Sequence, residues 1–381
     1  MALVLDDDQA LLRQTALDFA RSRLPVAELR RLRDTGDATG FDRAAWQEMA
    51  ALGWTGMLIP EDLGGNGFGH FGLGLVLEAL GRTLAASPML STVVLSGTAL
   101  GRAASHAGAV ELLGRIASGE AVVAFAHEEH ARHRPLEIAT VARRDGDGYV
   151  LDGRKRFVVD GHVADVLLVV ARTSGAGSDP EELSLFLVDG DAAGVTRHRL
   201  AMVDSRNSAD VGLSNVRVGR AALLGEEGAA GPLLERVLDV GRILLAAEMF
   251  GMAQQAFETT LEYLKQRQQF GVPIGSFQAL QHRAVQMYTD LELARSVLYE
   301  ALTALDDPAR SAEVPRLASV CKARLNDTLH LVSNEAVQLH GGIGMTDQVD
   351  VGLYLKRARV AQAALGNTAF HRDRYATLRG F

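Results

Sequence analysis

Hydrophobic residues recur at helical spacing through the first third of the chain. Between Asp8 and about Gly119 they return every three or four positions, for example over residues 11–19 and 75–80. That spacing places them on one face of a helix. The pattern predicts a helical domain over residues 1–120.

The pattern then changes to short runs rich in β-branched and other apolar residues. They lie at residues 149–151, 156–159, 166–170, 183–188 and 211–218. Turn-forming pairs lie between or beside them, at Asp147-Gly148, Asp152-Gly153 and Asp189-Gly190. We predict a compact β-domain over residues 121–226.

Helical spacing returns after the glycine-rich loop 225–231. It extends almost to the end of the chain, with segments near 232–266, 277–304 and 312–340, which predicts a second helical domain over residues 227–381. The stretch 237–256 is apolar nearly all round, as a helix buried among other helices requires. Glu248 interrupts this stretch, so its carboxylate must be paired, protonated or facing a polar pocket. A structural ion pair and a functional carboxylate both remain open.

The composition excludes several classes of protein. The 381 residues carry 39 basic and 47 acidic side chains, a formal charge of −8, which disfavours a nucleic-acid-binding surface. The single cysteine, Cys321, has no partner for a disulfide, which favours a reducing compartment. The amino terminus lacks a basic segment, and apolar runs such as 166–171 are too short to span a membrane. We therefore predict a cytoplasmic protein that does not enter the membrane.

Two motif-like segments do not support the chemistry they resemble. The glycines of residues 67–72 match G-x-G-x-x-G, but no apolar strand precedes them. His127 and His130 lie three positions apart, whereas the zinc-binding helix of metalloproteases needs four. With His133 they form no coherent ligand set in sequence, so no metal site is predicted.

Two helix ends carry residues that suit a pyrophosphate. Residues 267–282 end one long helix and open another around a loop, and residues 338–344 end the next long helix in glycines. Arginine and free backbone N–H groups are typical phosphate ligands, and glycine lets a backbone come close to a ligand. Each segment alone is better explained as a capped loop, but the pair favours a phosphate-rich ligand.

At these residues the sequence resembles the acyl-CoA dehydrogenase family. The matching motifs are Arg267-x-x-Phe270-Gly271-x-Pro-Ile274-Gly-x-Phe277-Gln278 and Gln338-x-x-Gly341-Gly342. Further matches at residues 59–65, 153–160 and 239–242 extend the resemblance over essentially the whole chain. Within the family, the small-subunit type of pimeloyl-CoA dehydrogenase is most similar. The resemblance implies an α+β multidomain fold with an N-terminal helix bundle, a central β-barrel-like domain and a C-terminal four-helix bundle.

The resemblance also implies a function. Family members bind FAD and remove hydrogens from Cα and Cβ of an acyl-CoA: a carboxylate takes the α-proton and the flavin takes the β-hydride. The residues implied to contact FAD are Arg267, Gln269, Phe270, Ile274, Phe277, Gln278, Gln338, Gly341, Gly342, Thr368, His127, Phe157 and Val159. Asp239, Arg242 and Asn367 are implied to lie near the substrate. Several FAD contacts address a neighbouring subunit, so a homodimer or homotetramer is expected.

The family's catalytic glutamate is missing. Its usual position near the carboxy terminus is Gly366, and the alternative position before Arg242 is Gly241. Glu248 lies two helical turns beyond Gly241 and faces the same way, so it is the candidate base. In an apolar pocket its pKa would be raised, as suits a base near neutral pH.

Three functions follow from this departure. The first is a FAD-dependent acyl-CoA dehydrogenase that uses Glu248 as its base and passes electrons to an electron-transfer flavoprotein. The second is a catalytically silent subunit of a heterotetramer with a related chain. The third is a flavin oxidase or monooxygenase of the same fold.

Overall fold

The computed structural model describes residues 4–174 and 182–381. Residues 1–3, part of the amino terminus considered above, lie outside this description. The chain packs as two compact units, each described here by itself. The first contains the described residues up to Asp34 together with His70–Ala85 and Arg242–Phe381, and the second contains Thr35–Gly69 and Ala86–Gly241. The division at residues 120 and 226 stays a prediction.

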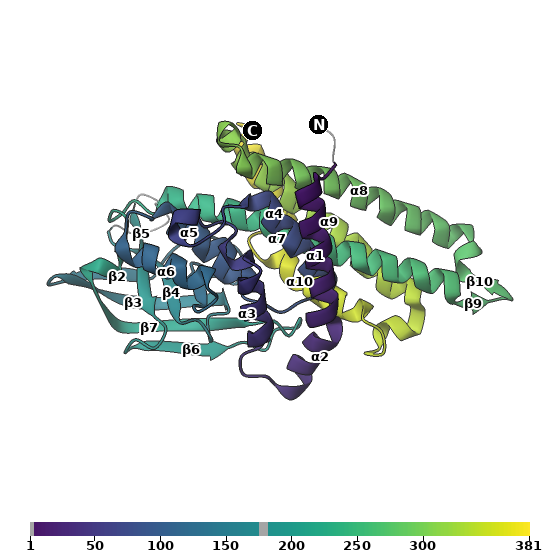
Figure 1. Ribbon diagram of the computed structural model, residues 1–381, viewed down its shortest axis with the longest axis horizontal. Coiled ribbons are helices and arrows are strands. Elements are labelled where there is room, and N and C mark those ends of the chain that lie inside the picture. Colours follow the sequence, from purple (N-terminus) through teal and green to yellow (C-terminus); the bar gives the residue numbers. More distant parts are fainter. Residues whose placement is uncertain (1–3, 175–181) are drawn as a thin grey trace. The chain divides into compact units, whose positions relative to one another are not determined.

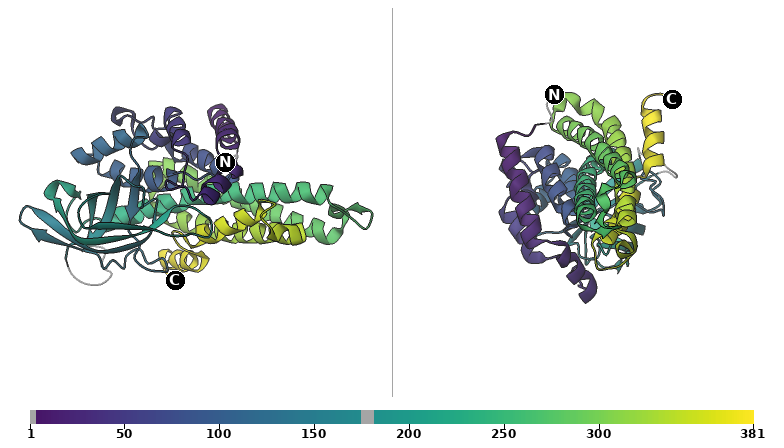
Figure 2. Two further views of the ribbon diagram at one scale, coloured as in Figure 1. Left: turned by 90° about the horizontal axis from the view of Figure 1, so that it is seen from below. Right: turned by 90° about the vertical axis from the view of Figure 1, so that its right-hand side faces the viewer.

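Long helices build the first unit (Figure 1). They are α1 (Asp7–Arg23), α2 (Val26–Thr35), α4 (Gly69–Arg82), α7 (Gly231–Gln266), α8 (Gln278–Asp306), α9 (Val314–His340), α10 (Val351–Ala363) and α11 (Thr368–Leu378). Of α7, the part from Arg242 onward belongs to this unit. Helices α8, α10 and α11 all pack on α9 (Figures 1 and 2). The helices predicted near 232–266, 277–304 and 312–340 are confirmed as α7, α8 and α9.

Glycines let α4 and α7 approach closely. A Cβ atom at Gly81 would overlap the backbone carbonyl of Glu248, and one at Gly251 would overlap the carbonyl of Glu78. Each helix therefore fits against bare backbone of the other. The segment of α7 that the sequence marks as apolar all round is buried, including Leu244, Met249 and Phe250.

The second unit is built on a mixed sheet. In the described residues it has eight strands: β1 (Val123–Ala126), β2 (Val141–Asp145), β3 (Gly148–Val159), β4 (Val166–Arg172), β5 (Leu183–Asp189), β6 (Val195–Arg199), β7 (Ser208–Gly219) and β8 (Leu223–Leu224). Their order is β6-β7-β3-β2-β4-β5-β8, and β1 pairs in parallel with β4. Helices α3 (Arg43–Ala51), α5 (Gly97–Arg102) and α6 (Ala107–Ala117) and a π-helix over Met89–Ser96 complete the unit.

Two details of the β-domain prediction are wrong. The runs at 149–151 and 156–159 belong to one strand, β3, and Asp152-Gly153 is not a turn but lies inside that strand. The pairing of β3 with β7 shifts register between Leu151 and Gly153, so the glycine marks a bulge. The turn between β2 and β3 lies at Gly146-Asp147, one residue before the predicted pair, because Gly148 already pairs with Asp145.

Candidate functional site

One end of the first unit brings the two phosphate-type motifs together. The Tyr263 hydroxyl near the end of α7 donates a hydrogen bond to the backbone carbonyl of His340 at the end of α9, at 3.2 Å. The two rings stack with centroids 4.3 Å apart. Arg267 and Gly341, which follow these residues in sequence, are therefore carried by helix ends that are fixed to each other.

A small hairpin lies beyond this helix end. Strands β9 (Gln268–Gln269) and β10 (Val272–Pro273) form it, and Phe270 at its tip is 93% exposed with a φ of 56°. The Phe270 ring contacts Phe277 edge to face, with centroids 6.1 Å apart. A fully exposed phenylalanine held in left-handed backbone is typical of a surface that another molecule covers.

The residues at this end are suited to hold a pyrophosphate. The Arg267 side chain is exposed, and a Cβ atom at Gly341 or Gly342 would meet nothing within 4 Å. The open glycine backbone and the guanidinium give an anionic group room and charge. The same end carries the other predicted FAD residues of this unit except Thr368, namely Gln269, Ile274, Gln278 and Gln338.

Thr368 and Asn367 belong to the start of α11. The Asn367 side chain caps that helix by accepting from the Phe370 backbone N–H at 2.9 Å. The Thr368 hydroxyl donates to Asp327 at 3.0 Å. Their expected contacts with FAD and substrate stay predictions, and so does that of Asp239, which is buried on α7.

In the second unit, β3 presents an aromatic ring at a bulge. Phe157 has a φ of 51° where the pairing of β3 with β7 shifts between Lys155 and Val158. Its side chain is 39% exposed, and the Arg156 guanidinium lies 5.2 Å from the ring centroid. The bulge turns the phenylalanine outward, as a ring that stacks on a flavin requires. Val159 follows, half-buried, at the end of the strand.

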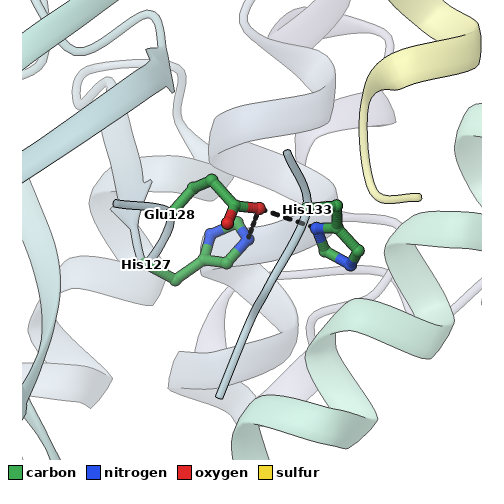
Figure 3. Close-up of side chains that lie close together, drawn as sticks. All are labelled: His127, Glu128 and His133. Atoms are coloured by element: carbon green, nitrogen blue, oxygen red, sulfur yellow. Dashed lines mark hydrogen bonds and ion pairs between the residues drawn. The ribbon is translucent and has the colours of Figure 1, made fainter. Parts of the chain in front are cut away.

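His127, Glu128 and His133 come together beside β1 (Figure 3). The Nδ1 atom of His133 lies 2.6 Å from Oε2 of Glu128, and the Nε2 atom of His127 lies 3.8 Å from the same oxygen. Desolvation opposes the ionised carboxyl of Glu128, but the hydrogen bond from His133 and the charges of both histidines outweigh it and lower the pKa of this group. The loop folds back on itself and so brings His127 and His133, but not His130, to one carboxylate, a contact that the sequence did not reveal.

A buried ion pair fixes the loop that contains His127, Glu128 and His133. Nζ of Lys155, fully buried on β3, donates to Oε1 of Glu129 at 2.6 Å. The other contacts of the Glu129 carboxylate are the backbone N–H groups of Ala139 and Thr140, at 2.6 and 3.0 Å. Both ends of the loop from His127 to Thr140 are thus fixed to the sheet.

Glu248 is an ion-pair partner. Its Oε1 atom accepts from Nε and Nη2 of Arg357 on α10, at 3.0 and 2.9 Å. The two side chains are only 8% and 10% exposed. Of the environments that the sequence allowed, the structure shows the paired one, and not the apolar pocket expected for a base. The role of Glu248 as the base stays a prediction, and serving as a base would cost this ion pair.

The position of the family's usual base is closed. Gly366 has a φ of 108°, and a Cβ atom there would lie 2.6 Å from Cδ1 of Phe370 and 2.7 Å from Nε2 of His371. The fully buried His371 ring is held by a 3.0 Å hydrogen bond to the Leu365 carbonyl. The aromatic residues of α11 therefore fill the room that a side chain at position 366 would need.

Buried cations hold the backbone of this loop. Nζ of Lys322 on α9 donates to the carbonyls of Ala361 and Gly366 at 3.0 and 3.2 Å. Nε of Arg242 donates to the Leu365 carbonyl at 3.3 Å, and its guanidinium lies over the Phe370 ring. Since Arg242 is fully buried, a direct contact with a CoA nucleotide would cost these interactions.

The buried ammonium of Lys322 makes stability depend on pH. Burial, together with the charges of Arg242 and Arg357 and opposed by Cys321, lowers the pKa of Lys322 to about 7. Between about pH 7 and the unfolded value near 10.5 the unfolded chain binds a proton that the folded chain has lost, so the free energy of unfolding rises with pH. Below about pH 7 the folded and unfolded chains both bind this proton, so Lys322 no longer makes the free energy of unfolding change with pH.

We therefore expect Lys322→Met to flatten the pH profile. Between pH 7 and pH 9 the wild type should gain about 2 kcal/mol of unfolding free energy relative to the variant, as measured by urea denaturation. Parallel profiles for the two proteins would contradict this prediction.

The sequence missed Lys322 and Arg357 as site residues. Both lie on buried faces of helices, where Leu325 and Leu329 follow Lys322 and Tyr354 and Ala361 flank Arg357 at helical spacing. A charged residue on an otherwise apolar helix face is the signal that would have found them.

Comparison with known protein families finds matches along three consecutive segments of the chain. Residues 6–120 match the model described as acyl-CoA dehydrogenase, N-terminal domain, residues 125–216 match the middle domain, and residues 232–377 match the C-terminal domain. Together these matches cover most of the chain. In the part that the structure describes, no helix combines the length and apolar character needed to cross a bilayer.

Individual relatives match over nearly their whole length. The chain is 33% identical to the acyl-CoA dehydrogenase FadE12 of Mycobacterium tuberculosis, over 84% of this chain and 83% of that protein. It is 28% identical to the caffeyl-CoA reductase-Etf complex subunit CarC of Acetobacterium woodii, over 94% of each. Among solved structures, the ChsE4-ChsE5 complex from Mycobacterium tuberculosis matches with a TM-score of 0.88 and 26% identity, over 100% of this chain and 99% of that chain.

Proposed function

This chain belongs to the acyl-CoA dehydrogenase family of FAD-dependent oxidoreductases, and we propose how its own residues serve the α,β-dehydrogenation of an acyl-CoA thioester. The observation that supports this proposal most strongly is the hydrogen bond from Tyr263 at the end of α7 to His340 at the end of α9. It places an exposed guanidinium and an open glycine backbone on one surface, as a dinucleotide cofactor requires.

Each part of the FAD site has a physical task. The flavin, when bound, accepts the hydride from the substrate. Arg267 and the backbone N–H groups of Gly341 and Gly342 bind the pyrophosphate of the FAD of a neighbouring subunit. The Phe157 ring stacks beside a flavin. Another subunit covers the exposed Phe270 ring. The FAD-bound protein is therefore a homodimer or a homotetramer.

Replacing Arg267 by Ala should weaken FAD retention. A charge-assisted hydrogen bond to phosphate is typically worth about 1.5–3 kcal/mol, so the dissociation constant should rise roughly 10- to 150-fold, as measured by equilibrium dialysis. Lys265→Ala is the matched control, because Lys265 is also an exposed cation, lies two positions earlier and pairs with Glu262. Unchanged FAD affinity, or a flavin-containing monomer, would contradict the assignment.

The closed position at Gly366 favours a second candidate function. A chain without a carboxylate at either family position would act as a catalytically silent subunit that completes FAD sites for a related chain in a heterotetramer. The structural similarity to one chain of the ChsE4-ChsE5 complex supports this candidate. For either candidate, the similarity to an Etf complex subunit supports an electron-transfer flavoprotein as acceptor. The lone Cys321 supports a cytoplasmic location.

Anaerobic bleaching of the flavin tests the proposed function. The purified chain, loaded with FAD, is mixed with a series of acyl-CoA thioesters, and the loss of flavin absorbance is followed. Reduction by the chain alone supports a complete dehydrogenase. Reduction only after a related chain is added supports the silent subunit, and FAD binding without reduction in either case would overturn both.

A further inference from the structure

We propose that His127, Glu128 and His133 form a binding site for a divalent transition metal ion of the zinc class. The three side chains offer two imidazole nitrogens and one carboxylate oxygen, and these ligand atoms all lie within 4.8 Å of one another. They come from one short loop after β1, and both imidazoles approach the same carboxylate oxygen of Glu128 (Figure 3).

The distances are close to those that a bound metal needs. Zinc bonds to nitrogen and oxygen of about 2.0–2.2 Å in tetrahedral geometry require ligand atoms roughly 3.3 Å apart. In the structure the carboxylate oxygen lies 2.6 Å from His133 and 3.8 Å from His127, so the required spacing falls between the two. The ligand atoms of the two imidazoles lie within 4.8 Å of each other, so small rotations of the side chains would complete the site.

The ligands are hidden from solvent. The side chains of His127, Glu128 and His133 are 8%, 14% and 4% exposed. The second carboxylate oxygen of Glu128 accepts the backbone N–H of Arg134 at 3.1 Å, and the backbone carbonyl of Glu128 accepts the N–H of Arg156 at 2.8 Å. These hydrogen bonds orient the carboxylate, as hydrogen-bond partners usually orient the ligands of a metal site.

The residue types select the metal. Two imidazoles and one carboxylate suit Zn²⁺, Co²⁺ or Fe²⁺ with an open coordination position, whereas Mg²⁺ and Ca²⁺ prefer oxygen ligands. One ligand charge leaves the occupied site cationic. The nearby ammonium of Lys155 is already neutralised by its 2.6 Å ion pair with Glu129, which limits repulsion.

The alternative explanation is a plain hydrogen bond between His133 and Glu128. The two explanations differ in what is bound between these groups, a metal or a proton. Metal binding needs neutral imidazoles, so the affinity for Zn²⁺ should fall as the pH is lowered.

Calorimetric titration with Zn²⁺ tests the proposal on the metal-stripped full-length chain, with and without FAD. We expect one Zn²⁺ per chain and no heat with Mg²⁺. His133→Ala and Glu128→Gln should each weaken binding at least about 100-fold, since even outer-shell changes cost 10- to 100-fold. His133→Gln preserves polarity in the pocket and serves if the alanine variant fails to fold.

His130 provides the matched control. It lies in the same loop, but its Nε2 atom contacts the Glu137 carbonyl at 3.1 Å and its side chain is 39% exposed. His130→Ala should therefore leave the Zn²⁺ affinity unchanged, and saturating Zn²⁺ should raise Tm by a few degrees in the control and not in the His133 variants. Absence of binding, binding that survives loss of His133, or equal binding of Mg²⁺ would overturn the proposal.

Discussion

Replacing Arg357 by Met is expected to lower the free energy of unfolding by about 3–5 kcal/mol. The change removes the guanidinium that donates two hydrogen bonds to Oε1 of Glu248 and leaves that carboxylate in a site only 8% exposed. An uncompensated buried charge costs far more than the net value of the pair itself. Urea denaturation of the purified variant measures the loss.

Two further variants serve as controls for this prediction. Arg359→Met removes an exposed arginine from the same helix and should change the unfolding free energy by no more than about 0.5 kcal/mol. The double variant Glu248→Met with Arg357→Met replaces the pair by apolar side chains and should recover most of the loss. A single Arg357 variant as stable as the wild type would show that the pair is not buried in solution.

Replacing Glu248 by Gln should slow flavin reduction by about 10²- to 10⁴-fold if Glu248 takes the α-proton, because that is the usual contribution of a positioned base. Stopped-flow reduction with an acyl-CoA thioester, under anaerobic conditions, gives the rate. Glu248→Asp is the companion variant, since it keeps the charge and withdraws it by one methylene group. An unchanged rate in the glutamine variant, with FAD retained, rejects Glu248 as the base.

Restoring the family's usual glutamate is not expected to rescue that variant. A side chain at position 366 would meet the rings of Phe370 and His371 at 2.6–2.7 Å, and the φ of 108° disfavours any residue but glycine. Gly366→Glu should therefore destabilise the chain and leave flavin reduction slow. Fast flavin reduction by this variant would show that α11 moves readily to make room for the glutamate side chain.

The helices were predictable because their burial is periodic. The sequence predicted α7, α8 and α9 within a few residues, since each has apolar positions at helical spacing over many turns. Strands β1, β2, β6 and β8 of the sheet were missed. Strand β6 alternates exposed and half-buried residues, most of them polar, and β1 is only four residues long, so neither has a run that marks a strand.

The candidate site divides in the same way. Arg267 and Gly341 were predictable, because each belongs to a local motif at a helix end. The partner of Glu248 was not, because Arg357 lies 109 positions away and only packing brings the two together. The contact of Glu128 with His133 was missed for a related reason: it depends on how a loop turns, and a loop has no period to read.

The crossing of α4 and α7 has a mechanical consequence. Gly81 and Gly251 each face the backbone carbonyl of the residue three positions before the other glycine, Glu248 and Glu78 respectively. If either helix slid by one residue along the other, a side chain would enter the place of bare backbone, so this pair of helices has a single permitted register. The buried carboxylates of Glu78 and Glu248 therefore keep fixed positions along the two helix axes. Any motion of α4 and α7 that admits a substrate must be a rotation about this crossing and not a slide of one helix along the other.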